Sequence, residues 1–229
     1  MMNNMNYSNY EELREFVDKF EDKQELRRVI NKSTHSYPFN YLGRPIIEAC
    51  NQPNINKDVV KLLLENGAEL CEDRVSILSC IYNNNKKLIY DIEFLNLLCG
   101  YGANINSCNP IYKSCMTFFE EIMFEEPYDE TYFKHLIRLG ADLNRKCNCH
   151  GFNVLMGNLD MNTFNFLIRH GASPFLKNND KYGVIDFYSD PTMKNYIKDV
   201  MNMYILSIHL IRNNKLSKDT ISKISEFFM

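Results

Sequence analysis

The sequence of 229 residues lacks any stretch of about 18 uncharged apolar residues, and its N-terminus has no apolar core of signal-peptide length. These absences predict a chain of the cytosol or nucleus that does not enter a membrane. There is no excess of positive charge either, since 26 Lys and Arg residues face 29 Asp and Glu residues. A net charge of -3 argues against nucleic acid or an anionic membrane as the partner. The hydrophobic content of 45% excludes a disordered chain.

Disulfide, metal and catalytic chemistry also lack the sequence patterns that they need. The eight cysteines are scattered and are expected to be free thiols that mostly fill the core. The strongest metal candidate is Cys147, Cys149 and His150, with Cys108 or Cys115 as a fourth ligand. A Cys-x-Cys pair lacks the two-residue gap of common structural zinc sites, so no metal is expected.

No nucleophile has a base placed beside it by a local motif, and no glycine-rich loop opens a helix to hold a phosphate. The five histidines are dispersed along the chain. The sequence therefore predicts no catalytic residues, no cofactor and no enzymatic activity.

The chain instead repeats itself. Four segments, residues 62–70, 97–105, 135–143 and 166–175, align on a Gly-Ala pair. The four glycines are 35, 38 and 31 residues apart. An amphipathic helix is predicted before each glycine, and the glycine is expected to end it in a left-handed conformation. The apolar positions predicted on the inner faces are Val60, Leu63, Leu64, Phe94, Leu95, Leu98, Phe133, Leu136, Ile137, Phe164, Leu167 and Ile168.

In this pattern the sequence resembles the ankyrin-repeat family, whose period is about 33 residues. A degenerate form of that family's first-helix motif occurs as RPIIEA at residues 44–49. The resemblance implies an all-α solenoid of helix-turn-helix repeats with short β-hairpin loops. We expect a helical N-terminal cap in residues 1–39, four to five degenerate repeats in 40–190 and a helical C-terminal segment in 191–229. Residues 8–32 are expected to form the body of this cap. In them Ser8 and Glu11 predict a capping box for a helix in which Leu13, Phe16, Val17 and Phe20 share a face.

A narrower resemblance concerns the stretch LSKDTISKISEFF at residues 216–228. It is similar to the F-box-like, PRANC-type tail of poxvirus ankyrin-repeat proteins, with Ser217 in place of the usual Pro. The residues that would bind the Skp-type adaptor of a cullin ubiquitin ligase are Leu216, Ile221, Ile224 and Phe227. Because an F-box fold needs further helices, the tail is expected to be truncated. The resemblance implies a host protein as partner, with innate-immune and NF-κB pathway components as candidates, in the host cytoplasm or nucleus.

The concave face of a solenoid, formed by hairpin tips and first helices, is the expected protein-binding surface. The residues predicted on it are Arg44, Glu48, Glu69, Glu72, Asn104, Asn106, Asp142, Arg145, Phe152 and Tyr182. Several of the Asn and Asp residues could equally be turn formers only.

The acidic stretch at residues 120–130 has two interpretations. It could be a docking loop for a basic surface, with contacts from Glu125, Glu126 and Tyr128, or a solvated insertion between two helices. Charge is also divided along the chain, because residues 1–130 carry 13 bases and 21 acids and the remainder carries 13 bases and 8 acids. Such a dipole could orient a charged partner or could be the chance result of solvated helix faces.

The main functional hypothesis is a non-enzymatic binding module that sequesters a host signalling protein. A second hypothesis is a substrate receptor that recruits a host protein to a cullin-RING ubiquitin ligase, and a third is a truncated, largely inactive fragment of a longer ankyrin protein. Self-association is a further possibility, through an apolar patch that seeks a partner. That patch comprises Tyr204, Ile205, Ile208, Leu210 and Ile211.

Overall fold

A computed structural model describes residues 7, 9–32, 44–70, 76–107, 116–125, 129–146 and 150–212. The chain divides into two compact units, Met1–Glu121 and Ile122–Met229, which are described separately here. Within the described ranges the secondary structure is helical, apart from isolated β-bridge residues that include the pair Lys177 and Gly183. The expected all-α class is therefore confirmed. The described helices include none with the length and hydropathy needed to span a membrane.

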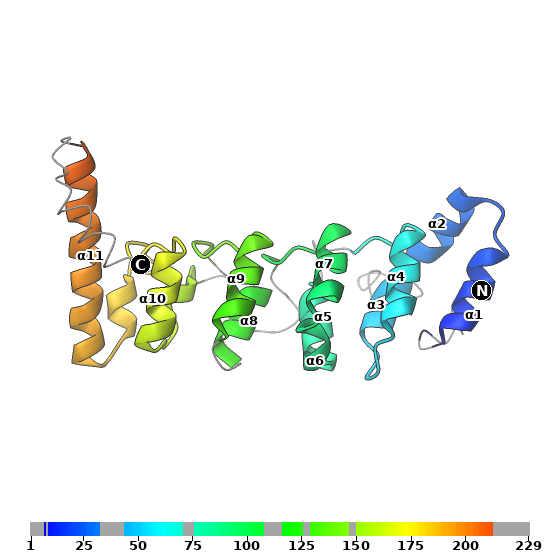
Figure 1. Ribbon diagram of the computed structural model, residues 1–229, viewed down its shortest axis with the longest axis horizontal. Helices are drawn as coiled ribbons and strands as arrows, with labels where there is room; N and C mark the ends of the chain where they lie inside the picture. Colours follow the sequence, from blue (N-terminus) through cyan, green and yellow to red (C-terminus); the bar gives the residue numbers. More distant parts are fainter. Residues whose placement is uncertain are drawn as a thin grey trace. The chain divides into compact units, whose positions relative to one another are not determined.

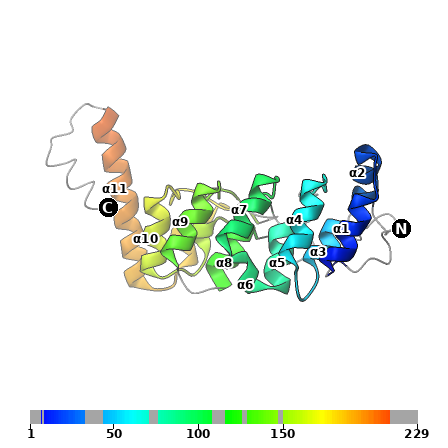
Figure 2. The ribbon, with the colours of Figure 1, turned by 45° about the vertical axis from the view of Figure 1, so that its right-hand side comes forward.

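The first unit contains seven helices in its described part and the beginning of an eighth. They are α1 (Tyr10–Asp18), α2 (Lys23–Asn31), α3 (Pro45–Cys50), α4 (Lys57–Glu65), α5 (Ile77–Asn84), α6 (Lys86–Ile89), α7 (Ile92–Gly100) and the start of α8 (Phe118–Glu125). Helix α3 packs against both α4 and α5, and Figure 1 and Figure 2 show α3 and α4 side by side. These contacts form the helix pair that the repeat pattern predicts.

The second unit contains the rest of α8, then α9 (Glu130–Arg138), η2 (Val154–Met156), α10 (Met161–Arg169), η3 (Val184–Phe187) and α11 (Pro191–Arg212). The elements η2 and η3 are single 3-10 turns that contact each other. Each stands where the repeat pattern expects a first helix, so the fourth repeat is shortened there, while α10 keeps its full nine residues.

The N-terminal cap differs from the prediction. Residues 9–32 contain two helices, and Asn9 caps the first of them, because its side chain accepts a hydrogen bond from the Glu12 N–H. The predicted capping box with Glu11 is wrong on this point, and Ser8 itself lies outside the described residues. Helix α1 contacts α4, and α2 contacts α3.

The helices α4, α7, α9 and α10 all have nine residues, because the same chemistry fixes both of their ends. A side-chain oxygen at the N-cap accepts a hydrogen bond from a backbone N–H of the first turn, which satisfies a donor that the helix leaves unpaired. The four caps are Asn56, Asp91, Asp129 and Asp160. Each precedes a glycine of the Gly-Ala pairs by eleven residues.

At the other end, the four glycines have φ between +90° and +98°, the left-handed region that glycine adopts with the least strain. The alanine after each glycine donates its N–H to the carbonyl five residues back, over 2.9–3.1 Å. This 6→1 bond defines a Schellman motif, which satisfies carbonyls that would otherwise lack a partner. The predicted stop at glycine is confirmed in all four repeats.

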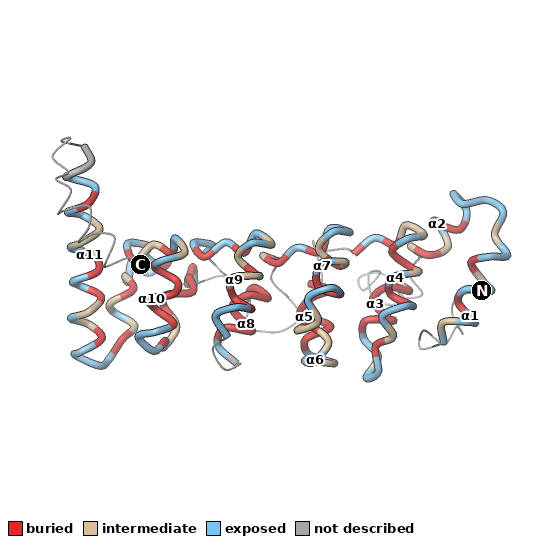
Figure 3. The backbone as a smooth tube through the Cα atoms, viewed as in Figure 1, coloured by how far each residue is buried: buried red, intermediate tan, exposed pale blue. Residues whose placement is uncertain are grey.

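The predicted inner faces are also confirmed, because all twelve apolar positions except Ile137 are buried. Helix α3 is buried at Pro45, Ile46, Ile47, Ala49 and Cys50, and Figure 3 shows that burial extends along most of its length. Burying such side chains contributes roughly 1.5–3 kcal/mol each relative to leaving them exposed. The core of each repeat therefore lies between its two helices and their neighbours.

The acidic stretch is not a solvated insertion at its start. Residues 118–125 form α8, and Glu120 and Glu121 are each only 5% exposed. The Thr117 N–H donates to Glu120 Oε2 over 2.9 Å, and the Glu120 N–H donates to Thr117 Oγ1. This reciprocal pair is a capping box that opens the helix. The side chain of Glu125, and Glu126 and Tyr128 entirely, lie outside the described residues.

Side-chain amides join successive helix pairs. Asn31 Nδ2 donates to the Gly67 carbonyl over 2.9 Å, and its Oδ1 accepts from the Glu69 N–H over 2.8 Å. In the second unit, Asn144 donates to the Gly171 carbonyl and accepts from the Ser173 N–H, over 2.8 and 2.6 Å. The amide thus pairs with the backbone on both sides of the Ala that follows a helix-ending glycine, and it fixes the turn of the next repeat.

An ion pair makes a similar connection in the first unit. Lys57, the first residue of α4, donates from Nζ to Asp91, the N-cap of α7. The hydrogen bond from Lys57 lowers the pKa of the Asp91 carboxyl, and the Phe94 N–H lowers it further. Asp91 therefore both accepts a backbone hydrogen bond as the N-cap of α7 and forms an ion pair with Lys57.

Replacing Asn144 tests the amide link. We expect Asn144→Ala to lower the free energy of unfolding by about 1 kcal/mol, because two hydrogen bonds to backbone groups are lost from a solvent-accessible site. Urea unfolding followed by circular dichroism measures the change. Asn158→Ala is the matched control, since Asn158 is exposed and has no hydrogen bond among the described residues. Equal midpoints for the two variants would contradict a role for Asn144.

The Lys57–Asp91 pair predicts a loss of stability in acid. The pKa of folded Asp91 lies below its ordinary value of 3.8, so its contribution is present above that pH and is lost as the pH falls through the folded value. Asp91→Asn keeps a capping side chain and removes the charge. We expect its thermal midpoint to fall below wild type at pH 7 and to converge with it near pH 2.

NMR titration of the Asp91 carboxyl provides the direct readout. In Lys57→Met, the pKa of Asp91 is expected to move up towards its ordinary value because the first cause of its lowering is removed. An unmoved pKa in that variant would show that the ion pair has no energetic role.

Candidate protein-binding surface

The predicted binding residues of the first unit are partly occupied by contacts within the fold. Arg44 is the N-cap residue of α3, and its Nη1 lies 3.6 Å from Glu69 Oε2. The Arg44 side chain is 23% exposed, whereas that of Glu69 is 67% exposed. Burial, with the nearby Glu48 carboxylate as a second cause, raises the pKa of Tyr7 to about 12. Glu72 lies outside the described residues.

Asn104 is a turn former, as the alternative interpretation proposed. Its Oδ1 accepts a hydrogen bond from the Asn106 N–H, and its carbonyl accepts one from the Ser107 hydroxyl. This Asx-turn is the local structure that Asn favours after a helix. Asn104 is exposed and Asn106 is half-buried, so their main visible role is to shape the loop that follows α7.

The second unit has two loops that reach beyond the helices. The first, residues 142–146, is opened by Asp142, whose Oδ1 accepts from the Asn144 N–H over 2.9 Å. Arg145 is exposed, and its N–H donates to the Asp142 carbonyl. This loop therefore holds Arg145 on a backbone that its own hydrogen bonds constrain.

The second loop, residues 173–183, is the more tightly ordered of the two. Asn178 is 5% exposed, its Oδ1 accepts from the Tyr182 N–H, and its own N–H donates to the Tyr182 carbonyl. Lys181 adopts a φ of +69°, which makes the tight reversal between them. The Lys177–Gly183 bridge continues the pairing. Tyr182 projects from this fixed hairpin with 56% of its surface exposed.

The two loops lie beside each other because backbone and side-chain bonds connect them. Asn144 bonds to both Gly171 and Ser173 near the base, and the Asn179 N–H donates to the His150 carbonyl over 2.9 Å. Gly151 has a φ of +67°, and a Cβ there would lie 2.3 Å from Asn179 Oδ1. Only glycine allows this close approach without rearrangement.

Phe152 connects this surface to the turns behind it. Its ring stacks on His150 with centroids 5.6 Å apart and meets Phe187 of η3 edge-on at 5.2 Å. Phe152 is half-buried, so it supports the surface more than it projects from it. The structure thus places Asp142, Arg145, Phe152 and Tyr182 on connected segments of one unit.

Sequence reasoning missed several exposed cations on the same loops. They are Lys146, Lys177 and Lys181. The available signal was their position, since each lies in a loop between a helix-ending glycine and the next first helix, where a solenoid presents side chains to partners.

No family model and no curated protein matches the chain in sequence. Its structure is similar to that of the ankyrin-repeat domain of Bcl-3, described as a unique member of the IkappaB protein family, with a TM-score of 0.52 and 17% sequence identity. That match covers 79% of this chain and 77% of the other. The chain has the ankyrin-repeat fold.

A second similar structure comes from Bdellovibrio bacteriovorus. It is a chain of the complex between the predatory endopeptidase Bd0816 and the immunity protein Bd3460, with a TM-score of 0.50 and 20% identity. The match covers 84% of this chain and 86% of the other. Both likenesses are of fold, and they agree with the helix pairs and Schellman turns described above.

The last ankyrin repeat ends differently from the others. Helix α11 has 22 residues, and its first half is buried at Met193, Ile197 and Val200, where it packs on η3. Its second half exposes Ile205 at 56% and Ile208 at 43%. Leu206 is exposed as well, and Tyr204 meets Phe175 with ring centroids 5.9 Å apart.

Two sets of predicted contacts involve the end of the chain. Of the residues expected in self-association, Ile205 and Ile208 are exposed, and the side chains of Leu210 and Ile211 lie outside the described residues. The adaptor-binding residues Leu216, Ile221, Ile224 and Phe227 also lie outside them. Both contacts stay predictions.

Among the described residues there is no group of three His, Cys, Asp or Glu side chains that could hold a metal ion. Cys147 and Cys149 of the candidate metal site lie outside those residues. Cys50 and Cys80 are buried thiols in α3 and α5. They pack in the core as small apolar side chains do.

Two glycine substitutions in the connected loops compare the cost of a positive φ alone with the cost of a positive φ plus a steric clash. Gly171→Ala is expected to cost about 1 kcal/mol, because only its positive φ disfavours a side chain and nothing lies within 4 Å. Gly151→Ala is expected to cost about 2–3 kcal/mol, since the new methyl group also displaces Asn179. Urea unfolding compares the two, and equal losses would show that the contact with Asn179 is not constraining.

Proposed function

We propose that the chain is a protein-binding module with no catalysis of its own, and that its contact surface is formed by residues 142–146 and 173–183. The observation that carries this proposal is the rigid presentation of Tyr182. Its ring is 56% exposed, although the hairpin that bears it is fixed by three hydrogen bonds between Asn178 and its neighbours. An aromatic side chain held in this way loses little entropy on binding and is a frequent hot spot of interfaces.

Exposed cations outnumber exposed acids on the two loops that form this surface. The cations are Arg145, Lys146, Lys177 and Lys181, and the acids are Asp142 and Asp180. Charged groups at the rim of an interface mainly raise the rate of association and the specificity. The surface therefore suits a partner that offers an apolar pocket for Tyr182 with acidic groups around it.

The biological partner is proposed from the resemblances. Similarity to poxvirus ankyrin-repeat proteins supports a host-range or immune-modulating role in the host cytoplasm or nucleus, through sequestration of a host signalling protein. The likeness in fold to Bcl-3, a member of the IkappaB family, supports a component of the NF-κB pathway as one candidate. The similar chain from a complex with an immunity protein supports protein binding in general.

The alternative function is a substrate receptor for a cullin-RING ubiquitin ligase. The observation that favours it is the F-box-like spacing of apolar residues after Leu216. Substitution of the usual Pro by Ser217 weakens the match, and for this reason we place sequestration first. A largely inactive fragment is the remaining alternative, and it requires that the Tyr182 surface bind nothing.

Affinity purification from mammalian cells with quantitative mass spectrometry tests the surface. We expect Tyr182→Ala to reduce recovery of the partner by about tenfold or more, because loss of a hot spot costs at least one such factor. Met161→Ala is the matched control, since Met161 is an apolar residue of the same unit, 39% exposed at the start of α10. Equal recovery with both variants would contradict the proposed surface.

A chain that ends at Arg212 separates the two leading functions. It retains α11, whose Ile197 and Val200 are part of the core. Sequestration predicts that the partner is recovered with both lengths of chain and ligase subunits with neither. Ligase subunits recovered only with the full chain, and lost in Leu216→Asp, would replace sequestration by the receptor function.

A further inference from the structure

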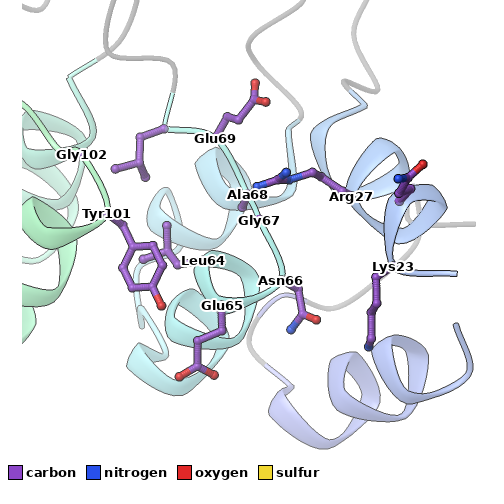
Figure 4. Close-up of a pocket in the computed structure, with 12 residues that line it drawn as sticks. Lys23, Arg27, Leu64, Glu65, Asn66, Gly67, Ala68, Glu69, Tyr101 and Gly102 are labelled. Atoms are coloured by element: carbon purple, nitrogen blue, oxygen red, sulfur yellow. The ribbon is translucent and has the colours of Figure 1, made fainter. Parts of the chain in front are cut away.

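The first unit contains a groove that the proposed function does not use. Its volume is about 850 Å³, and it lies between α2 and the turns that follow α4 and α7 (Figure 4). The side chains that matter are Lys23 and Arg27 of α2, Glu65 and Glu69 beside the α4 turn, and Tyr101 after α7. The Tyr182 surface belongs to the other unit, so the two sites can be examined independently.

The wall of the groove formed by α2 carries two cations that have no partner among the described residues. Lys23 and Arg27 are four residues apart, which places them on one face of the helix, and both are exposed. Neither forms an ion pair or a side-chain hydrogen bond within the described part of the chain. Their charges are therefore available to a ligand.

A glycine leaves room for the Arg27 side chain over the floor of the groove. A Cβ at Gly67 would lie 2.5 Å from Arg27 Nε, so the guanidinium lies where a side chain would otherwise be. Figure 4 shows Arg27 extending towards Gly67. The same glycine ends α4 with a φ of +90°, and its carbonyl accepts the Asn31 amide. The position of Arg27 thus depends on backbone that the fold already fixes.

The two acids of the groove are already paired with cations outside it. Glu65 Oε1 lies 3.9 Å from Lys61 Nζ, and Glu69 Oε2 lies 3.6 Å from Arg44 Nη1. The charges of Glu65 and Glu69 are compensated by Lys61 and Arg44, whereas those of Lys23 and Arg27 are not compensated by any described residue. The groove therefore favours an anionic ligand. Tyr101, 45% exposed at the edge of the groove, adds an aromatic surface for an apolar group.

We propose that this groove binds an acidic segment of a partner protein, with carboxylates at Lys23 and Arg27 and an apolar side chain against Tyr101. Nucleic acid fits the site less well, because its backbone demands a longer series of cations. Residues 1–130 carry 21 acids against 13 bases, and this excess repels every anion. It therefore limits the ligand to a short segment with a few carboxylates, which the local pair of cations can neutralise, and disfavours a polyphosphate more strongly.

Fluorescence anisotropy of the full chain tests the proposal, with a fluorescein-labelled peptide of Glu and Asp residues around a central Phe as the probe. We expect Lys23→Gln and Arg27→Gln each to raise the Kd by about threefold to fivefold, as befits solvent-exposed charges. Tyr101→Ala is expected to raise it by a similar factor, because the Phe loses its contact.

Arg28→Gln is the matched control. Arg28 lies next to Arg27 on α2, is exposed, pairs with Glu25 and does not line the groove. The substitution changes the net charge by the same amount as Arg27→Gln, so it should leave the Kd within twofold of wild type. Equal weakening by Arg27→Gln and Arg28→Gln would show unspecific attraction and would overturn the proposal.

Three further outcomes decide the assignment. An unchanged Kd in Lys23→Gln, whose side chain has no contact to disturb, would overturn the site even if Arg27→Gln misfolds. Displacement of the probe by single-stranded oligothymidine at equal charge concentration would assign the groove to nucleic acid instead. Tyr182→Ala should leave the Kd unchanged, and a loss in that variant would move probe binding to the other unit.

Discussion

The structure depends on a constraint that acts at both ends of each second helix. An Asn or Asp side chain begins the helix, and a glycine at positive φ ends it eleven residues later. Between them lie nine helical residues and one C-cap residue, enough for the apolar positions that the first helix and its neighbours cover. Because the length is fixed by local chemistry, each repeat presents its turn at the same height relative to its core.

That constant height is what allows neighbouring repeats to join. The Asn31 and Asn144 amides find a carbonyl and an N–H at the same two positions of the next turn, although they come from different places in the sequence. Each link connects adjacent repeats only, as expected for a solenoid. The loops that carry Tyr182 and Arg145 are rigid because they extend from turns fixed in this way. The hydrogen-bonded turns thus support exposed side chains that the fold itself does not require.

Much of this frame could be predicted from the sequence, because the Gly-Ala pairs and the apolar spacing report local physics. Left-handed glycines and buried helix faces follow directly from them. The N-caps could also be predicted from the sequence, since Asp91, Asp129 and Asp160 each lie eleven residues before a glycine. An alignment of the apolar residues alone does not reveal this spacing. The cap was misassigned to Ser8 because Ser and Asn are comparable N-caps, and only the backbone decides between adjacent candidates.

The rest depends on tertiary contacts that no local pattern contains. A run of acids normally marks a solvated surface, yet Glu120 and Glu121 are buried in α8, where Thr117 is hydrogen-bonded to Glu120. The unpaired charges of Lys23 and Arg27 were not predictable either. These two charges are available to a ligand because Glu65 pairs with Lys61 and Glu69 pairs with Arg44. The predicted contact residues stay predictions, but the structure shows which of them also shape the fold, as Asn104 does through the hydrogen bond that it accepts from the Asn106 N–H.

The last helix shows what happens when this constraint is removed. Asp190 caps α11 as the other caps do, but the residue eleven positions later is Met201, and the helix continues for eleven more residues. At Met201 the helix therefore passes through the position where the four second helices end in a left-handed glycine. In the earlier repeats the turn at that glycine receives the amide of the preceding repeat, from Asn31 or Asn144. Helix α11 offers no such turn at Met201, so it is joined to the preceding turn η3 by the apolar side chains of its first half instead.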